Sequence, residues 1–288
     1  MYKLETVNNS NFSFIDAFNI TNEYKEELME ICANKNVFKK LLLGKNIKFI
    51  KLGNHYIGFM WFSKLQHQCY KIHCIKVIPE FNNEVYYHEL FKLFNNGSSI
   101  IIGDNNNLKK DLLISMGFKV INTIVEMKRP LNKEALLNLP HPEITFRVFI
   151  DGIDEKKRCI IQNKVFNSLT RQAIDEEDVL FEKYQKHYIP EGCVFICKNG
   201  IDIGYGQLIK KDSKIYIANL GILPTYRGAG YGKLLLTHLL KIAEKFDCQY
   251  IYLRCDKENT DALKLYNSQG FKIIESYREY EKNIMSIV

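Results

Sequence analysis

Hydrophobic and polar residues alternate along much of the second half of the chain with the two-residue period of β-strands. This pattern predicts strands at 144–149, 193–198, 201–210, 214–223, 250–254 and from 271 onward. Asn199-Gly200 and residues 211–213 are typical of tight turns, so the three middle strands are expected to form an antiparallel meander.

A three-to-four-residue spacing of apolar positions predicts helices between these strands. The expected helices cover residues 154–166, a short stretch after Asp175, residues 232–246 and residues 261–268. The longest carries an apolar stripe made of Leu234, Leu235, Leu239, Leu240, Ile242 and Ala243. The resulting order, β-α-α-β-β-β-α-β-α-β, predicts an α+β sandwich in which helices flank one mixed, mostly antiparallel sheet.

The first half of the chain repeats this order of elements. Four blocks match at shifts of 146, 146, 145 and 153 residues: Phe49-Ile50 with Phe195-Ile196, Ile57-Gly58-Phe59 with Ile203-Gly204-Tyr205, Val77 to Phe81 with Ile222 to Tyr226, and Gly117-Phe118-Lys119 with Gly270-Phe271-Lys272. A nearly constant shift indicates a tandem duplication. Residues 128–143 hold three of the six prolines, so we expect one domain at 1–130, a linker at 131–142 and a second domain at 143–288.

Composition and charge narrow the class of protein. The chain has 288 residues, 46% hydrophobic and 25% charged, which is typical of a folded protein with room for two domains. It has no apolar run of the roughly 18–20 residues that cross a bilayer, and its start is too polar for a signal peptide. Eight cysteines, mostly inside apolar runs, favour free thiols in a reducing compartment. We therefore expect a cytoplasmic protein with no membrane partner.

The net charge of +7 favours anionic partners without naming one. Residues 1–130 hold 17 basic and 12 acidic residues, but the lysines are scattered and show no zinc-finger spacing. A solvated surface explains this charge better than nucleic-acid binding, so no nucleic acid is expected as a partner.

The glycine-rich segment from Leu220 to Lys233 is the most informative about function. Its pattern predicts a strand, then a glycine-rich turn, then the start of a helix. Such a turn lets the backbone approach a phosphate at the helix N-terminus. A Walker A loop would need Gly at 227 and Ser or Thr at 234, where Arg and Leu stand. A dinucleotide fingerprint is also excluded, because the glycines fall at 228, 230 and 232.

Arg-x-x-Gly-x-Gly after a strand that ends in Pro-x-Tyr resembles the acetyl-CoA pyrophosphate loop of the GNAT superfamily of N-acyltransferases. A second block, Asn259-x-x-Ala262-x-x-Leu265-Tyr266-x-x-x-Gly270-Phe271, follows at the spacing seen in that family. Together the blocks cover about residues 144–282. The resemblance implies two tandem GNAT domains and acetyl-CoA as the acyl donor, without a metal.

The resemblance also implies roles for individual residues. Backbone N–H groups of the strand would bind the pantetheine arm, those of the loop the pyrophosphate, with Arg227 adding positive charge. Asn259 would contact the cofactor arm, and Tyr266 would face the departing sulfur as the general acid. The expected cofactor-binding residues are Leu220, Gly221, Ile222, Leu223, Arg227, Gly228, Ala229, Gly230, Tyr231, Gly232, Lys233, Asn259, Ala262 and Tyr266.

The sequence departs from the common pattern of the family at the general base. Many members of the family place a Glu on the fourth strand, but residues 214–223 contain no carboxylate and Asn219 stands at the matching position. An Asn can orient a water molecule but cannot accept the proton. Glu275 and Glu279 near the last strand are further candidates, and the amine could instead arrive neutral or lose its proton through water.

Three other groups of polar residues have structural explanations. The acidic run 175–178 fits the first turn of a helix better than a receptor for a cationic substrate. Two groups of possible metal ligands are interpreted as residues of a sheet, because no full set of ligands accompanies either one. They are Cys193 with Cys197, and His67 with Cys69, His73 and Cys74.

The first half has lost the features that bind the cofactor. Asn82, Asn83, Glu84 and Val85 stand where the loop has Arg227 to Gly230, and Glu84 would repel a pyrophosphate. Asn106 matches Asn259, but Leu113 replaces Tyr266. We therefore expect a degenerate, non-catalytic GNAT domain at 1–130.

The sequence thus predicts an N-acetyltransferase whose second half transfers the acetyl group of acetyl-CoA to a primary amine of an unidentified acceptor by direct attack on the thioester. Two alternatives stay open: a non-catalytic acyl-CoA-binding or scaffold protein, and a transferase that uses a longer acyl-CoA. The chain is expected to be a monomer or a homodimer.

Overall fold

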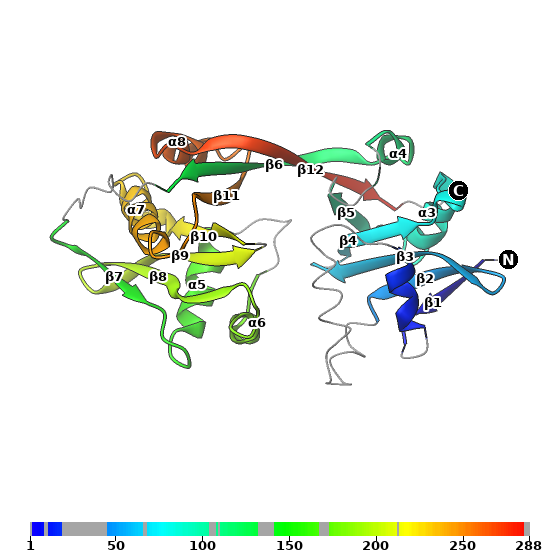
Figure 1. The fold of residues 1–288 in the computed structure, drawn as a ribbon, viewed down its shortest axis with the longest axis horizontal. Helices are drawn as coiled ribbons and strands as arrows, with labels where there is room; N and C mark the ends of the chain where they lie inside the picture. The colour runs from blue at the N-terminus through cyan, green and yellow to red at the C-terminus, as the bar shows by residue number, and fades with distance from the viewer. Residues whose placement is uncertain are drawn as a thin grey trace. The chain divides into compact units, whose positions relative to one another are not determined.

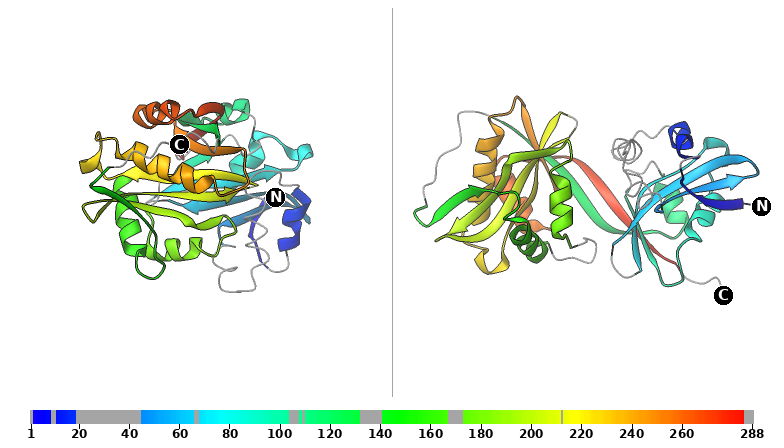
Figure 2. Two further views of the ribbon diagram at one scale, coloured as in Figure 1. Left: turned by 60° about the vertical axis from the view of Figure 1, so that its left-hand side comes forward. Right: turned by 90° about the horizontal axis from the view of Figure 1, so that it is seen from below.

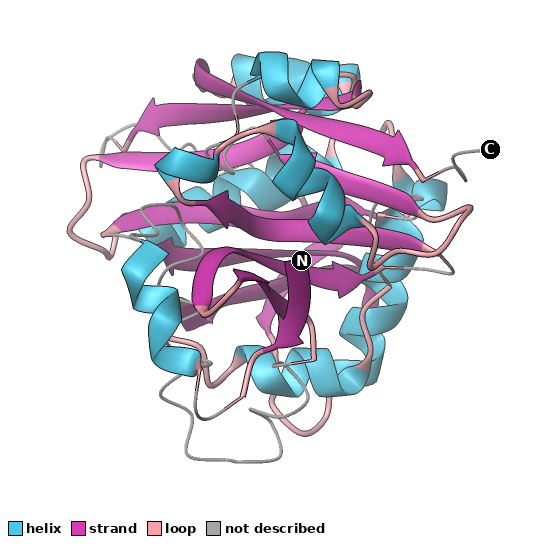
Figure 3. Cartoon of the chain, turned by 90° about the vertical axis from the view of Figure 1, so that its right-hand side faces the viewer, coloured by secondary structure: helices cyan, strands magenta, loops and turns pink. Residues whose placement is uncertain are grey.

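The structure, a computed structural model, describes residues 2–8, 11–18, 45–65, 68–103, 108, 110–131, 141–166, 173–211 and 213–284. The chain forms two compact units. Unit 1 comprises Met1–Thr123 together with Tyr277–Val288, and unit 2 comprises Ile124–Ser276. Strands, magenta in Figure 3, form the sheets of both units, and the helices, cyan, pack against them.

Unit 2 contains the mixed, mostly antiparallel sheet that the alternation of residues predicts. Its strand order is β6-β11-β10-β9-β8-β7, in which only β10 and β11 run parallel. The predicted meander is confirmed, and Asn199 and Gly200 have the positive φ angles of 47° and 79° that its tight turn requires. The strands are β6 (Lys119–Pro130), β7 (Ile144–Val148), β8 (Tyr188–Lys198), β9 (Ile201–Lys211), β10 (Lys214–Ile222) and β11 (Tyr250–Asp256).

Helices cover both faces of this sheet (Figures 1 and 2). On one face α7 (Tyr231–Ala243) and α8 (Thr260–Ser268) bury a leucine-rich core against β10 and β11. On the other face α5 (Glu155–Val165) and α6 (Glu176–Glu182) pack over the aromatic side chains of β8 and β9. Asp175 and Asp178 form a capping box at the start of α6, which confirms the structural interpretation of the acidic run.

Unit 1 repeats the same order of elements, as the shifted blocks predict. Its sheet has the order β1-β2-β3-β4-β5-β12, and again only one neighbouring pair, β4 and β5, is parallel. Its elements are β1 (Tyr2–Thr6), η1 (Phe12–Phe18), β2 (Ile47–Leu52), β3 (His55–Lys64), β4 (Cys69–Val77), η2 (Pro79–Phe81), α3 (Glu84–Phe91), β5 (Ser99–Gly103), α4 (Lys110–Ser115) and β12 (Lys272–Asn283).

Each half of the chain gives the end of its last strand to the other unit. Residues 124–130 of β6 pair with β11 in unit 2, and residues 279–283 of β12 pair with β5 in unit 1 (Figure 1). Tyr280 is completely buried in the core of unit 1. The predicted boundaries at 130 and 143 do not include this exchange, and residues 132–140 of the expected linker lie outside the described residues.

Two further observations concern what the described residues do not form. None of their helices is long and apolar enough to cross a membrane. No group of three or more His, Cys, Asp or Glu side chains among them is arranged to hold a metal ion.

Candidate active site

Strand β10 separates from β11 in the middle of the sheet of unit 2. Their parallel register covers only Ile215–Ile217 and Ile251–Leu253, although β10 continues to Ile222. Just beyond this point the pairing of β10 with β9 shifts between Ala218 and Gly221, and Asn219 has a left-handed φ of 52°. A β-bulge of this kind bends a strand. The bend directs the end of β10 away from β11, so that an extended ligand could pair with its backbone.

The segment after β10 builds an anion site from backbone atoms. Pro224–Tyr226 forms a single turn, and Gly228 and Gly230 then adopt φ angles of 83° and 81°. Gly230 is the N-cap of α7, and no side chain caps the helix there. The first N–H groups of an uncapped helix carry partial positive charge and bind phosphate well. A Cβ atom at either glycine would have no described atom within 4 Å, so the backbone conformation, not crowding, requires glycine.

Arg227 holds this loop in place. Its Nε donates to the carbonyl oxygen of Ile222 at 3.0 Å, and its Nη2 donates to that of Val165 at 3.3 Å. These bonds join the loop to the end of β10 and to the end of α5. The predicted contribution of Arg227 to pyrophosphate binding stays a prediction, and the structure adds this positioning role.

Gly221 allows α5 to approach β10 closely. A Cβ atom at this position would lie 2.1 Å from Cγ1 of Val165, a distance that real atoms do not adopt. The neighbouring Ile222 is buried, whereas Leu220 and Leu223 are partly buried. The loop itself is open to solvent at Ala229 and Lys233, and Tyr231 anchors the start of α7 in the core.

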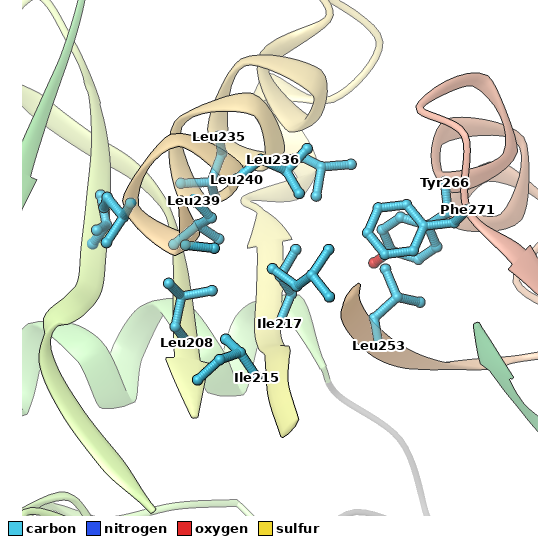
Figure 4. Close-up of a cluster of buried hydrophobic side chains, with 14 of the residues drawn as sticks. Leu208, Ile215, Ile217, Leu235, Leu236, Leu239, Leu240, Leu253, Tyr266 and Phe271 are labelled. Carbon is cyan, nitrogen blue, oxygen red and sulfur yellow. The ribbon is translucent and has the colours of Figure 1, made fainter. Parts of the chain in front are cut away.

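Tyr266 lies on α8 beside the point where β10 and β11 separate. Only 7% of it is exposed, and its ring packs edge-on against Phe271 at 6.0 Å. Figure 4 shows its hydroxyl oxygen pointing from α8 toward Leu253. Burial raises the pKa of Tyr266 far above its usual value, and the nearby Cys255 thiol adds to this effect. The phenol therefore stays protonated and can serve as a hydrogen-bond donor.

Asn259 sets the start of α8. Its side-chain oxygen accepts a hydrogen bond from the backbone N–H of Ala262 at 3.1 Å, as expected of an N-cap. The cap determines where the helix begins and hence where Tyr266 points. A contact of Asn259 with the cofactor arm stays a prediction.

The structure separates the candidates for the general base. Asn219 sits in the bulge of β10, and Glu275 is exposed within unit 2. Glu279 belongs to unit 1, where its carboxylate accepts hydrogen bonds from Lys71 at 2.9 Å and from Asn122 at 3.2 Å. Because these bonds explain Glu279 as part of unit 1, we do not retain it as a base.

Unit 2 contains a buried carboxylate that the sequence patterns did not predict. Glu126 on β6 is only 3% exposed and pairs with Arg254 on β11, with Arg254 Nε and Glu126 Oε2 2.8 Å apart. Tyr216 on β10 donates to the other carboxylate oxygen at 3.4 Å. A charged residue between the apolar Val125 and Met127 was the available signal. It was overlooked because residues 1–130 were assigned to the other domain.

The equivalent region of unit 1 does not form an anion site. Helix α3 starts at Asn83, whose side chain accepts the hydrogen bond of the Val85 N–H at 3.1 Å, and Glu84 lies in its first turn. Leu113, at the position that matches Tyr266, is completely buried. Asn106 lies outside the described residues. These contacts agree with the interpretation of unit 1 as a domain without the cofactor loop.

Comparisons with known proteins agree with this geometry. Residues 163–271 match the model of the acetyltransferase (GNAT) family. The chain is 40% identical over 78 residues to N-alpha-acetyltransferase 50 of Danio rerio, covering 26% of this chain and 45% of that protein. It is 26% identical over 165 residues to mycothiol acetyltransferase of Thermomonospora curvata, covering 56% of this chain and 55% of that protein. The chain thus spans about half the length of these relatives.

Solved structures extend the likeness to the whole chain. A GCN5-related N-acetyltransferase from Sphaerobacter thermophilus has a TM-score of 0.66 at 15% identity and covers 100% of this chain and 97% of its own. A tandem GNAT protein from the clavulanic acid biosynthesis pathway has a TM-score of 0.61 at 10% identity, with 98% of both chains covered. At these identities the likeness shows the fold, which is that of two tandem GNAT units.

Proposed function

We propose that this chain, a tandem GNAT-family acyltransferase, binds acetyl-CoA in unit 2 and transfers the acetyl group to a primary amine. The family model matches residues 163–271, which lie in unit 2, and the relatives are named as acetyltransferases, which supports the reaction class. Unit 1 has no catalytic role in this proposal, since its helix α3 is capped by Asn83 and Leu113 replaces the phenol.

One observation carries the proposal. Within residues 214–233, the end of β10 that is not paired with β11 is followed directly by α7, a helix whose N-terminus has no side-chain cap. The amides of a pantetheine arm can pair with the backbone of β10 from Ala218 to Ile222, where β11 has separated. The pyrophosphate then reaches the N–H groups at the start of α7 and the positive-φ glycines before it. Acetyl-CoA is a ligand that has both a pantetheine arm and a pyrophosphate.

The chemistry needs few groups from the protein. The nitrogen of a neutral amine attacks the thioester carbonyl carbon and loses one proton to water, the carbon–sulfur bond breaks, and the thiolate takes a proton. Tyr266 is the proposed proton donor, because its buried phenol is protonated and points toward the gap between the strands. Backbone N–H groups of β10 stabilise the oxyanion that forms on the carbonyl oxygen.

Calorimetric titration of the full chain with acetyl-CoA tests the binding site. We expect one site per chain, abolished by Gly230→Glu, which adds charge and strain to the loop. Gly152→Glu is the matched control, because Gly152 also lies in unit 2, has a φ of 79° and has open space around it. Absence of binding to the unaltered chain, or two sites per chain, would contradict the proposal.

Release of free thiol from acetyl-CoA tests the transfer. The amines to supply are a peptide with a free α-amine, a lysine peptide with a blocked N-terminus, glucosamine and spermidine. Amine-dependent thiol release supports a transferase. Tight acetyl-CoA binding without release by any of these amines would favour a non-catalytic acyl-CoA-binding protein, and faster release from a longer acyl-CoA would change the donor.

The proposed place of action is the cytoplasm. The described cysteines, seven of the eight in the chain, are free thiols, and five of them are buried. Unpaired thiols of this kind persist in a reducing compartment.

A further inference from the structure

The face of the unit 2 sheet opposite the leucine-rich core carries basic and aromatic side chains at the end where β10 and β11 begin. Side chains alternate between the two faces of a strand, so Lys214 and Tyr252 face away from Ile215 and Ile251, which are buried in that core. We define the basic-aromatic surface by five residues of four adjacent strands: Lys128 of β6, Tyr250 and Tyr252 of β11, Lys214 of β10 and Lys211 of β9.

The register of the strands brings these five side chains together. Lys128 stands directly opposite Tyr252 in the pairing of β6 with β11, and Lys211 stands opposite Lys214 in the pairing of β9 with β10. The Nζ atom of Lys128 lies 4.6 Å from the ring centroid of Tyr250. That of Lys214 lies 4.9 Å from the ring centroid of Tyr252. Cations and aromatic rings are therefore interspersed on this surface.

Two of the three lysines have no carboxylate partner among the described residues. Lys128 and Lys214 contact the two rings and form no ion pair within the described parts of the chain. Lys211 stands directly opposite Lys214, and like charges in that position destabilise a pair of strands. The exposed Asp256 lies further along β11, where it accepts a hydrogen bond from the backbone N–H of Glu258 at 2.8 Å. An anionic ligand would compensate the charge of the lysines.

The aromatic rings of the basic-aromatic surface are accessible to a ligand. Tyr250 is 36% exposed and Tyr252 is half-buried. An exposed ring offers a flat face on which a nucleobase can stack, whatever the base. Adjacent strands are about 4.8 Å apart, so four strands span about 14 Å, which accommodates about four nucleotides at a rise of about 3.4 Å. An acidic peptide would pair with the lysines but would leave the rings unused.

We propose that the basic-aromatic surface binds single-stranded nucleic acid, with its lysines at the phosphates and its two tyrosine rings stacked on bases. The lysines are scattered in the sequence, which gave no reason to expect this partner. The pairing of β6 with β11 brings Lys128, from the first half of the chain, to the same surface as Lys211 and Lys214 from the second. The inference does not rest on the proposed function, because this binding uses neither the glycine loop nor acetyl-CoA.

The test follows the fluorescence anisotropy of a labelled single-stranded RNA of about 12 nucleotides, within the usual range of site sizes, as the full chain is added. Three phosphate contacts predict that the logarithm of the affinity falls with the logarithm of the salt concentration with a slope of about −2. Binding at about 200 mM salt should thus be about 20-fold weaker than at about 50 mM. A DNA strand of the same sequence is measured beside the RNA, and the tighter of the two shows whether the partner is RNA or DNA.

Substitutions separate the charges from the rings. Lys128→Gln combined with Lys214→Gln should weaken binding at least about tenfold and reduce the slope to about −0.7, since one phosphate contact remains. Tyr250→Leu should weaken binding about 5- to 150-fold, the scale of one stacked base, and Tyr250→Phe should preserve it because the ring stays. Lys156→Gln with Lys164→Gln is the matched control, because it removes two exposed charges from α5 of unit 2 and should leave the affinity unchanged.

Four results would overturn the inference. The first is no binding of either strand at about 50 mM salt, where phosphate contacts are strong. The second is an affinity that neither the double lysine substitution nor Tyr250→Leu lowers more than the matched control does. The third is equally tight binding of a polyglutamate peptide, which has charge but no bases. The fourth is displacement of the RNA by excess acetyl-CoA, which would place the RNA at the glycine loop. None of these results bears on the acetyl-CoA titration, which tests the proposed function separately.

Discussion

Tyr280 provides a test of the strand exchange. This residue follows the glycine loop by fifty positions in the sequence, yet its side chain is completely buried in the core of unit 1, among residues such as Leu90, Ile102 and Phe118. Its hydroxyl oxygen is buried as well and makes no hydrogen bond to any described residue. Burial of the Tyr280 ring thus stabilises the core of unit 1, whereas burial of its hydroxyl group without a hydrogen bond destabilises it.

The two parts of the side chain predict opposite effects. Removing the unsatisfied hydroxyl in Tyr280→Phe should stabilise unit 1 by about 1 kcal/mol, the desolvation cost of a buried polar group. Removing the ring costs about 3–5 kcal/mol in the Phe→Ala comparison. Tyr280→Ala should therefore destabilise unit 1 by about 2–4 kcal/mol. Acetyl-CoA binding in unit 2 should change little in either variant.

The chain supplies its own probe for this measurement. Trp61 is the only tryptophan in the sequence, and it is buried in unit 1. Urea unfolding followed by its fluorescence reports unit 1, while calorimetry with acetyl-CoA reports unit 2. An unshifted Trp61 transition in Tyr280→Ala, together with lost acetyl-CoA binding, would refute the exchange and place β12 in unit 2.

Three further predictions concern single residues. Tyr266→Phe should lower kcat at least tenfold with acetyl-CoA affinity unchanged, and unchanged turnover in the thiol-release assay would remove its role as the acid. Gly221→Ala places a Cβ atom 2.1 Å from Cγ1 of Val165, so it should lower the free energy of unfolding by about 1–3 kcal/mol in thermal unfolding. A second change, Val165→Ala, should restore most of the lost stability. Burial, aided by Lys71, lowers the pKa of His73 to about 4, so its contribution to stability is complete above pH 6.5 and is lost as the pH falls toward 4. The Trp61 transition should weaken over that range in the unaltered chain, because the centroids of the Trp61 and His73 rings lie 4.7 Å apart. A slope of the same size in His73→Phe would contradict this.

Local patterns in the sequence predicted most of the fold. The alternation in β8, β9 and β10, the Asn199-Gly200 turn and the leucine stripe of α7 each act over a few residues, and the structure has all of them. The glycine loop was also predictable, because a positive φ at Gly228 and Gly230 depends on local backbone sterics.

The pairing partners of the last strands were not predictable in this way. A strand pattern at 119–130 or 272–283 is the same whichever edge the strand joins, since pairing depends on residues far away in the sequence. For this reason the sequence did not predict that Glu126 lies in unit 2 or that Glu279 lies in unit 1. The structural roles of Arg227 and Asn259 were not predicted either. Arg227 bonds the carbonyl oxygen of Val165, a residue that only the fold brings close, and Asn259 caps α8.

The exchange of strand ends also affects how the protein is made. During synthesis the first half leaves the ribosome well before the strand that covers its β5 edge, because β12 follows all the other strands of unit 2 in the sequence. Until then that edge is open to pairing with other chains, a known route to aggregation. A premature stop before β12 would therefore damage the first half of the chain, although the codons of residues 1–130 had all been translated.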